Sequence, residues 1–270
     1  MFARFDGNGE GEPILYLHGF PTSSYDLAPA LPLLTKNRRV LCHDHLGFGL
    51  SEKPQDYSYS LVEQAEVALA VWRSFGVDRG HVVAHDYGTS VATELCARAA
   101  REVLPFKMLS VTFCNGSMML ELAKLRVTQR LLRNPITGPA FAWLANRRMF
   151  VAQMQRILSR PDAVSTHELD LHWWLAEHGG GKKRLPQVSR YLDERVRFRE
   201  RWIGSLARLA KVGVRVNVVW AMRDPIAVPE IATRVAALAG IQVRWLDQLG
   251  HYPMLEDPAA WSAAVEAGLA

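Results

Sequence analysis

The sequence has little of what membrane anchoring, secretion or disulfide bonding requires. It contains no run of about 18 unbroken apolar residues, which excludes a membrane-spanning helix of ordinary length. Residues 1–13 lack the apolar core of a secretory signal, so we expect a cytoplasmic protein. The three cysteines, Cys42, Cys96 and Cys114, are an odd number set among apolar or small neighbours, which favours buried free thiols over a disulfide.

Motifs for cofactors and metals are also missing. The sequence contains neither GxGxxG nor GxxxxGK[ST], so neither a dinucleotide site nor a phosphate-binding loop is expected. The segment HELDLH at 167–172 resembles the zinc motif HExxH, but Leu171 stands where that motif needs histidine. His43 and His45 flank Asp44 in HDHLGFGLS, which we interpret as a tight structural loop. We therefore expect no metal and no cofactor.

The charge excess is small and local. Lysine and arginine outnumber aspartate and glutamate by 32 to 27, and much of the excess lies in residues 179–202. Acidic residues are interleaved in that stretch, and no nucleic-acid-binding motif surrounds it. We interpret it as a solvated helix face, and nucleic acid is not expected as a partner.

What the sequence does contain is a regular alternation of strand and helix patterns. Short apolar runs bounded by turn residues predict strands, and periodic segments with capping signals predict helices. We predict strands at 13–19, 39–44, 81–85, 108–115, 214–221 and 241–247, and helices at 60–76, 89–100 and after Pro258. This order predicts an α/β fold, in which a mostly parallel sheet is flanked by helices on both faces.

One long segment interrupts this alternation. Residues 116–211 contain helix-like patterns and no clear strand. A helical block between two strands of one sheet is most simply a lid over the sheet edge. We therefore predict a core domain formed by 1–115 and 212–270, with 116–211 as an inserted helical lid.

The turn after the third predicted strand carries an aspartate. Ala84, His85, Asp86, Tyr87 and Gly88 follow the small-x-nucleophile-x-small pattern of a nucleophile elbow. A carboxylate needs no deprotonation and attacks carbon electrophiles to give an alkyl-enzyme ester, which water must then hydrolyse. Asp86 also precedes a predicted helix, so an ordinary N-cap is the alternative. The surrounding motifs favour the nucleophile.

Other polar residues follow strands at the same edge of the predicted sheet, where parallel sheets bind ligands. His251 follows the last strand and is the expected base for the hydrolytic water. Asp224 follows the strand before it and would orient His251 and stabilise its protonated form. The amides of Phe20 and Tyr87 would form an oxyanion hole.

Five motifs together resemble one family. HGFPTSSYDL, DHLGFGLSEKP, HDYG, RDP and GHYPMLEDP are similar to the α/β-hydrolase superfamily, in its aspartate-nucleophile branch of epoxide hydrolases and haloalkane dehalogenases. Within it, the chain resembles the hydrolases of the mesoderm-specific transcript protein type, including the segment YLDERVRFRERWIGSL. The resemblance implies the α/β-hydrolase fold with an inserted lid. The order of Asp86, Asp224 and His251 along the chain also matches the order of nucleophile, acid and base in this fold.

The resemblance also suggests roles for lid residues. Similar epoxide hydrolases protonate the epoxide oxygen with two lid acids, usually tyrosines. Tyr191 is the only tyrosine in 116–211, and His172 is a candidate second donor or else a packed histidine. Similar dehalogenases hold the halide with indole groups, one of them just after the nucleophile. Tyr87 departs from that pattern, although Trp173 or Trp174 could supply a lid indole.

The predicted function is a cofactor-free hydrolase that acts on a small apolar organic substrate and water. Epoxide opening to a vicinal diol is favoured, with haloalkane dehalogenation as the alternative. A fluoroacetate dehalogenase resembles parts of the chain, but the arginines which that group carries beside the nucleophile are missing next to Asp86. A non-catalytic binding protein and an ester- or lactone-acting relative also remain open.

Overall fold

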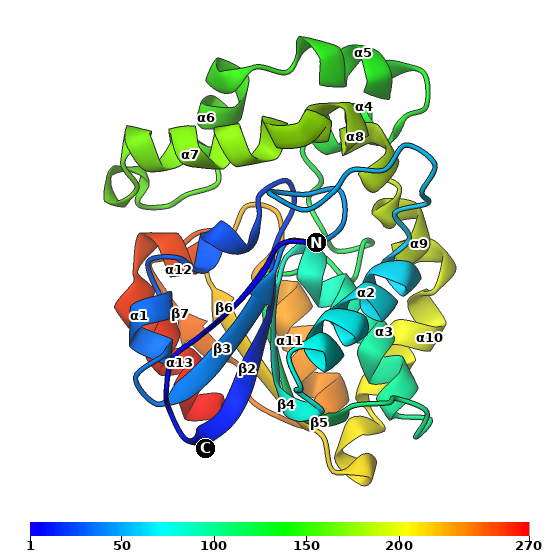
Figure 1. The fold of residues 1–270 in the computed structure, drawn as a ribbon, viewed down its shortest axis with the longest axis vertical. Coiled ribbons are helices and arrows are strands. Elements are labelled where there is room, and N and C mark those ends of the chain that lie inside the picture. The colour runs from blue at the N-terminus through cyan, green and yellow to red at the C-terminus, as the bar shows by residue number, and fades with distance from the viewer. Residues whose placement is uncertain (270) are drawn as a thin grey trace.

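The computed structural model describes residues 1–269 and has a seven-stranded sheet at its centre (Figure 1). The strand order is β1-β3-β2-β4-β5-β6-β7, with β1 antiparallel to β3 and the other neighbours parallel. The strands are β1 Ala3–Asp6, β2 Gly11–Leu17, β3 Arg38–His43, β4 Arg79–His85, β5 Lys107–Cys114, β6 Arg215–Ala221 and β7 Arg244–Leu246. The predicted mostly parallel sheet is confirmed.

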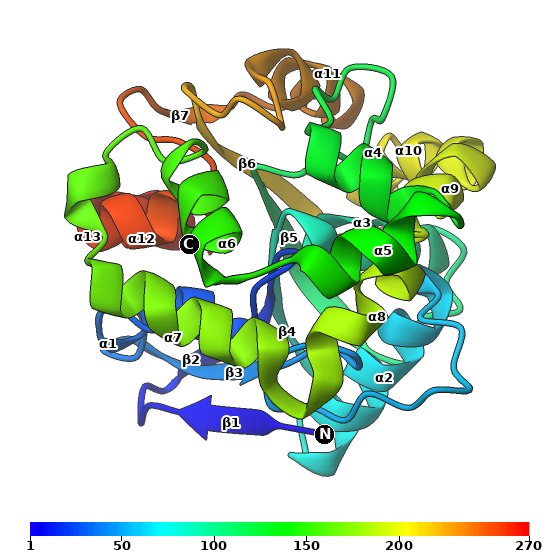
Figure 2. The ribbon, with the colours of Figure 1, turned by 90° about the horizontal axis from the view of Figure 1, so that it is seen from above.

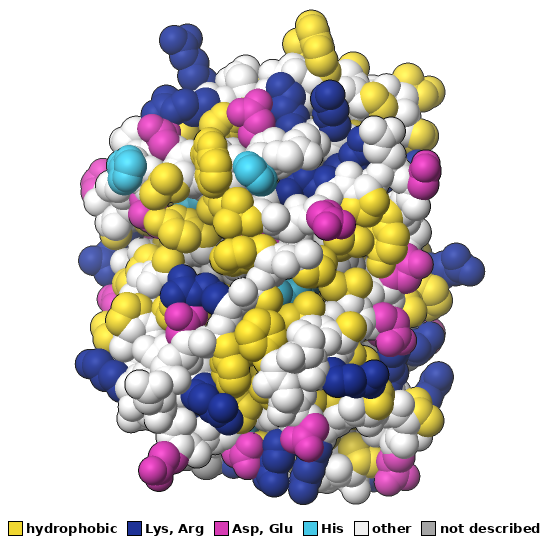
Figure 3. All heavy atoms as spheres, in the orientation of Figure 1, with side chains coloured by type: hydrophobic (Ala, Val, Ile, Leu, Met, Phe, Trp, Pro, Cys, Tyr) yellow, Lys and Arg dark blue, Asp and Glu magenta, His cyan; other side chains and the backbone are white. Residues whose placement is uncertain are grey.

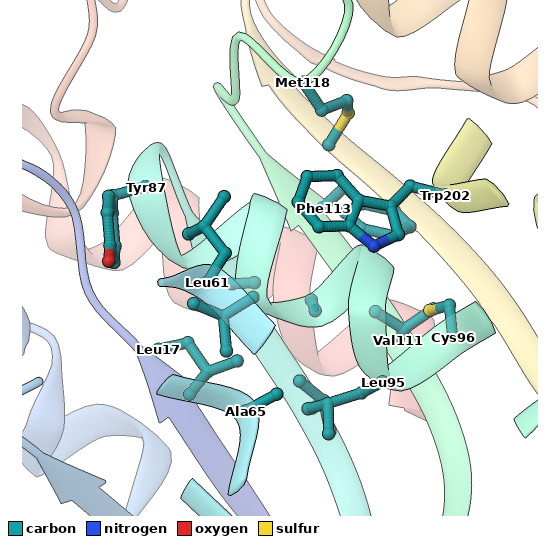
Figure 4. Packing of buried hydrophobic residues seen from close by; sticks show 14 of the residues in the cluster. Leu17, Leu61, Ala65, Tyr87, Leu95, Cys96, Val111, Phe113, Met118 and Trp202 are labelled. Atoms are coloured by element: carbon teal, nitrogen blue, oxygen red, sulfur yellow. The ribbon is translucent and has the colours of Figure 1, made fainter. Parts of the chain in front are cut away.

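Successive side chains of a strand point to opposite faces of the sheet, and here both faces carry apolar side chains. Helices therefore cover both faces. Leu15 and Leu17 of β2 join a hydrophobic cluster with one set of helices, part of which Figure 4 shows. Ile14 and Tyr16 join a second cluster on the other face. The first face is covered by α2 Leu61–Ser74, α3 Tyr87–Ala99 and α11 Pro229–Ala239, and the second by α1 Leu31–Leu34 and α13 Pro258–Leu269.

The predicted elements agree with the structure to within a few residues. The helix predicted at 60–76 is α2, and the Ser60 hydroxyl caps it by accepting a hydrogen bond from the Val62 amide at 3.2 Å. The prediction omits β1 and α11. The four residues of β1 are too few to give a clear alternating pattern.

The segment between β5 and β6 is helical, and no strand occurs in the described residues 116–211. It comprises α4 Val127–Arg133, α5 Thr137–Leu144, α6 Arg147–Gln155, α7 Thr166–Glu177, α8 Gly181–Val188, α9 Tyr191–Arg197 and α10 Arg199–Leu206. Helices α4 to α8 lie beyond the carboxyl ends of the strands, and Figure 2 shows them from above. Helix α10 packs against α3 instead. We interpret this segment as the lid.

The three cysteines are free and buried, as predicted. They lie in the hydrophobic clusters on the two faces of the sheet. Burial raises the pKa of each thiol, to about 12 for Cys42 and Cys114. None of the helices within residues 1–269 is both long and apolar enough to cross a membrane.

Candidate active site

Asp86 lies on the turn between β4 and α3, with φ 42° and ψ −105°. A positive φ is uncommon outside glycine, so the surrounding packing must hold this conformation. The chain approaches the turn closely: a Cβ atom on Gly88 would lie 2.2 Å from the Leu17 carbonyl oxygen. One on Gly19 would lie 2.8 Å from His85 Nδ1. Small residues are therefore required around the turn, as in a nucleophile elbow.

The two carboxylate oxygens of Asp86 have different surroundings. Oδ2 accepts a hydrogen bond from the Phe20 amide at 3.0 Å. Oδ1 is buried and has no hydrogen-bond partner among residues 1–269. Asp86 also stands at the N-terminus of α3, where the helix dipole favours a negative charge. One oxygen is thus held by the protein while the other is free.

His251 and Asp224 form a buried pair at the ends of the last two strands. The distance between His251 Nδ1 and Asp224 Oδ2 is 2.7 Å, so the ring nitrogen donates to the carboxylate. The amides of Ile226 and Ala227 donate to Asp224 Oδ1 at 2.7 and 3.0 Å. Burial lowers the pKa of His251, but the charge and hydrogen bond of Asp224 and the charge of Asp86 together raise it to about 9. His251 is therefore an imidazolium at neutral pH.

Asn115 also belongs to this group, although it is absent from the sequence-based prediction. Its Nδ2 donates to Asp224 Oδ2 at 2.8 Å, and its Oδ1 accepts from the Ala221 amide at 3.0 Å. Asn115 has φ 43° and follows β5 directly, just as Asp86 follows β4. A polar residue directly after a buried strand is the signal that could have identified it.

Two neutral histidines hold the loops around the site. His18 Nδ1 donates to the Gly19 carbonyl at 2.8 Å, and Nε2 accepts from the His45 amide at 2.9 Å. His85 Nε2 donates to the His251 carbonyl at 2.7 Å. Burial lowers the pKa of His18 to about 3 and that of His85 to about 4. The Phe20–Pro21 peptide bond in the same loop is cis.

Phe20 and Tyr87, the two predicted oxyanion-hole residues, lie at the elbow. The Phe20 amide already points at Asp86, as its hydrogen bond shows. Tyr87 is the first residue of α3, and its side chain is buried in the core beside the α2 residues (Figure 4). The Tyr87 ring therefore contributes to packing, and only its backbone is available to a substrate.

A cavity of about 110 Å³ adjoins the elbow and is lined by Phe20, Asp86 and His251 on the side of the sheet. Its other walls come from α4 to α8 and are mostly apolar. Gln129 and Trp173 also line this cavity. Pockets for drug-sized ligands are usually several hundred Å³, so this space suits a small molecule.

The three lid residues singled out from the sequence occupy different places. Trp173 lines the cavity. Tyr191 packs against the rings of Phe20 and Tyr87, and its hydroxyl accepts a hydrogen bond from Gln129 Nε2 at 3.3 Å. Burial raises the pKa of Tyr191 to about 12, against the opposing charge of Arg195.

Tyr191 is not among the residues that line the cavity. His172, the third of these lid residues, lies outside the cavity lining as well. Its Nδ1 is 3.6 Å from Asp26 Oδ1, and its ring packs against Tyr25. Burial lowers the pKa of His172 to about 4, so the ring is neutral. Trp174 is 53% exposed and faces solvent.

Arg195 is a buried cation beneath the elbow. It belongs to the stretch 179–202 that was expected to be solvated, yet it is only 1% exposed. Its guanidinium donates to Ser90 Oγ at 2.7 Å, to Ser117 Oγ at 2.5 Å and to the Asp86 carbonyl at 3.4 Å. It also lies 4.4 Å from the centre of the Tyr191 ring. Arg195 thus connects α9 to the turn that carries Asp86, which the charge pattern alone does not indicate.

No set of three His, Cys, Asp or Glu side chains suited to a metal ion occurs in the described chain. The site consists instead of a free carboxylate oxygen, a charged His–Asp pair, an amide donor and an apolar cavity. These groups suit attack on carbon followed by attack of water on the product ester.

Comparison with protein families gives one match over most of the chain. The family model described as alpha/beta hydrolase fold matches residues 12–258. A hydrolase named LipZ from Mycobacterium tuberculosis is 38% identical over 265 residues, covering 98% of this chain and 90% of LipZ. The mesoderm-specific transcript protein of Mus musculus is 32% identical over 260 residues, covering 93% of this chain and 76% of that protein.

Solved structures with the same fold include enzymes of two activities. The haloalkane dehalogenase DbeA from Bradyrhizobium elkani superposes with a TM-score of 0.77 at 25% identity, covering 98% of this chain and 94% of DbeA. The epoxide hydrolase CorEH superposes with a TM-score of 0.75 at 17% identity and the same coverage. These superpositions establish the shared fold and leave the substrate to be argued from the site.

Proposed function

This protein belongs to the α/β-hydrolase family and is a hydrolase, and on that premise we propose that it forms an alkyl-enzyme ester on Asp86 and opens epoxides to vicinal diols. The observation that carries the proposal is the asymmetry of the Asp86 carboxylate. Oδ2 is held by the Phe20 amide, and Oδ1 is buried without a hydrogen bond from the described residues, beside an apolar cavity. A serine-dependent hydrolase would need a hydroxyl at this position.

In the first step, Asp86 Oδ1 attacks an epoxide carbon. A carbon–oxygen bond forms to Oδ1, the carbon–oxygen bond of the ring breaks, and its electron pair goes to the departing oxygen. That oxygen takes a proton from the Tyr191 hydroxyl, which accepts a hydrogen bond from Gln129 Nε2 and so keeps its own hydrogen free to donate. The raised pKa of Tyr191 keeps the hydroxyl protonated until the ring opens.

In the second step, water attacks the carbonyl carbon of the ester. Negative charge then develops on Oδ2, which the amides of Phe20 and Tyr87 stabilise. His251 takes the proton from water, which requires a neutral imidazole. The bond between the carbonyl carbon and Oδ1 then breaks, and Oδ1 leaves with the product as a hydroxyl group that takes the proton from His251. The oxygen from water completes the new Asp86 carboxyl group, whose proton returns to the Tyr191 phenolate. Ester formation removes the negative charge of Asp86, one of the groups that raises the pKa of His251 from its ordinary value to about 9. The first step therefore prepares the base for the second.

Haloalkane dehalogenation is the second candidate, because the Trp173 side chain lines the cavity where an indole would hold a halide. The residue after Asp86 argues against dehalogenation. Tyr87 is fully buried in the core, so this chain offers no halide donor from that side chain. Epoxide opening is also supported by Tyr191, the single lid tyrosine, which packs against Phe20 and Tyr87 next to Asp86.

Both candidates are tested by trapping the ester. The variant His251→Phe lacks the base, so incubation with small epoxides or haloalkanes should stall after the first step. Intact mass spectrometry should then show an adduct equal to the whole epoxide. An adduct equal to the alkyl group without its halogen would replace the epoxide proposal with dehalogenation.

A matched control separates trapping from adventitious labelling. The double variant Asp86→Asn, His251→Phe has the same substitution at position 251 as the single variant and also removes the proposed attacking carboxylate. It should acquire no adduct. Labelling of the double variant, or an inert single variant beside an inert folded wild type, would overturn the ester mechanism and favour a binding protein or an ester- or lactone-acting hydrolase.

A further inference from the structure

The outer side of the lid exposes apolar side chains to an unusual degree. Ile136, just before α5, is 84% exposed, and Trp143 and Leu144 of α5 are 77% and 57% exposed. Ile136 and Trp143 are the most exposed large hydrophobic residues in the described chain. Helix α5 reads TGPAFAWL and has no charged residue, whereas an exposed helix normally has a polar outer face. Its outer face is therefore suited to contact with something other than water.

The segment that contains α5 also carries the net positive charge of the chain. Residues 126–190 contain eleven lysines and arginines against four aspartates and glutamates, a net charge of +7, whereas the rest of the chain has 21 against 23. In Figure 3, hydrophobic and basic side chains protrude together at the end of the molecule where Figure 1 places α5. The positive charge of the protein is thus a property of the lid.

A groove of about 680 Å³ between α5 and α8 brings the two features together. Its walls include Trp143 on one side and Lys182, Lys183 and Arg190 on the other. None of these three cations forms an ion pair with another described residue. They are available for an external negative charge.

We propose that this face, which we call the roof patch (Ile136, Trp143, Leu144, Lys182, Lys183 and Arg190), docks on the surface of an anionic phospholipid bilayer. Exposed tryptophan and aliphatic side chains enter the headgroup boundary, while lysine and arginine interact with anionic lipid. A second copy of the chain is a poor occupant, because two faces of net positive charge repel each other. A nucleic acid would pair with the cations but would leave Ile136 and Leu144 in water.

The position of α5 connects this docking to the cavity. Phe141 of α5 and Ala145, which follows it, line the cavity beside Asp86, while Trp143 and Leu144 point outward. A single helix turn therefore separates the cavity from the bilayer in the docked protein. Docking itself does not depend on which electrophile Asp86 attacks, so its test is independent of the proposed function.

The test measures binding of the full chain to vesicles of phosphatidylcholine, with and without phosphatidylglycerol, by flotation at low and high salt. We expect binding only where phosphatidylglycerol is present, and weaker binding at high salt because surface charges are then screened. The double variant Lys182→Glu, Lys183→Glu should lower the partition coefficient by at least about thirty-fold. The double variant Trp143→Ser, Leu144→Ser should lower it by about tenfold or more.

A matched control changes an equally exposed apolar residue and cation on the opposite part of the molecule. Arg101→Glu with Val103→Ser, both on exposed residues between α3 and β5, should bind vesicles as the wild type does. All variants should keep the wild-type melting temperature, because none of the changed side chains is buried. No binding to anionic vesicles would overturn the proposal, as would equal binding by the roof-patch and control variants.

Two further outcomes would replace it. Binding to double-stranded DNA with no binding to vesicles would show that the cations serve nucleic acid. A concentration-dependent dimer that disappears in the Trp143→Ser, Leu144→Ser variant would show that a second copy covers the patch.

Discussion

The floor and the roof of the cavity are built in different ways. The floor consists of residues at strand ends, and its side chains are fixed by buried hydrogen bonds, as in the contacts of Asp224 with His251, Asn115 and two backbone amides. The roof consists of side chains from short helices, and these make few hydrogen bonds to one another across the cavity. Gln129, which donates to Tyr191, is the exception.

This difference suggests a division of roles. A site that must place an attacking oxygen and a base accurately needs rigid supports, and strand ends supply them. A surface that selects among small apolar molecules needs shape, which apolar side chains on helices can change without disturbing the sheet. We therefore expect substitutions in the floor to alter the rate with every substrate, and substitutions in the roof to alter the choice of substrate.

The largest effect should come from Asp86→Asn, which replaces the proposed attacking carboxylate with an amide and keeps the shape of the side chain. We expect kcat to fall by about 10⁴-fold or more with every substrate, because the nucleophile and its partners act as a unit. The melting temperature should stay close to that of the wild type. A variant that keeps activity toward one substrate class would show that the floor does not govern all reactions.

Acid should destabilise the floor. Burial lowers the pKa of His18 and His43 to about 3 and that of His85 to about 4, so these rings stay neutral in the folded protein below the ordinary value of 6.5. The unfolded chain binds more protons in that range, and stability must fall as the pH drops below 6.5. These three rings together should cost about 5 kcal/mol of unfolding free energy between pH 6.5 and 5.

His251 has the opposite dependence. Its folded pKa of about 9 exceeds the ordinary value of 6.5, so its contribution is complete below 6.5 and is lost as the pH rises through 9. Urea unfolding at a series of pH values should therefore show a maximum of stability near pH 7, where the two opposite dependences cancel. A flat profile between pH 5 and 6.5 would mean that these histidines take up protons in the folded state.

Substitution of Arg195 tests how much the contacts between α9 of the lid and the floor contribute to stability. Arg195→Met keeps the length of the side chain and leaves the hydroxyls of Ser90 and Ser117 without their donor, which should cost about 2–3 kcal/mol of unfolding free energy. Arg195→Lys retains the charge and should restore part of this loss. If the two variants are equally stable, the charge itself contributes nothing. A loss of activity larger than the loss of folded protein would indicate that Arg195 positions the elbow.

The smallest effect on activity should come from a substitution in the helical wall of the cavity. Trp173→Phe removes the indole N–H from the cavity and keeps an aromatic ring. We expect kcat/KM with epoxides to change by no more than about threefold, because the proposed proton donor to the epoxide oxygen is Tyr191. Activity with haloalkanes, if present, should fall by about tenfold or more, because a halide donor is lost. Assaying one variant with both substrate panels gives the loss of kcat/KM with haloalkanes relative to the loss with epoxides. An equal loss with both would show that Trp173 does not influence the choice of substrate.

The sequence predicts the floor better than the roof, for a physical reason. Asp86, Asp224 and His251 each follow a buried strand, and the carboxyl ends of parallel strands meet at one edge, so their meeting follows from the order of elements. Asn115 obeys the same rule and could have been found with it. The positions of Tyr191, His172 and Trp173 depend on the angles between short helices, which no local pattern in the sequence specifies.

The burial of Arg195 shows the same limit. An arginine among interleaved acidic residues is normally solvated. Only the tertiary approach of α9 to Ser90 of α3 and to Ser117 places this one beneath the turn that carries Asp86. The cysteines were easier to predict, because their apolar neighbours in the strands and in α3 fix their burial locally.

The insertion of the lid between β5 and β6 has a consequence for the order of folding. These strands are neighbours in the sheet, with Ser110 opposite Arg215, although about 100 residues separate them. The entropy of closing such a loop grows only logarithmically, so a linker tenfold shorter would lower its cost by about 2 kcal/mol. During synthesis from the N-terminus, β4 and Asp86 emerge long before Asp224 and His251. A half-made chain thus holds the proposed nucleophile without the base that would release an ester, and any electrophile it captured would remain attached.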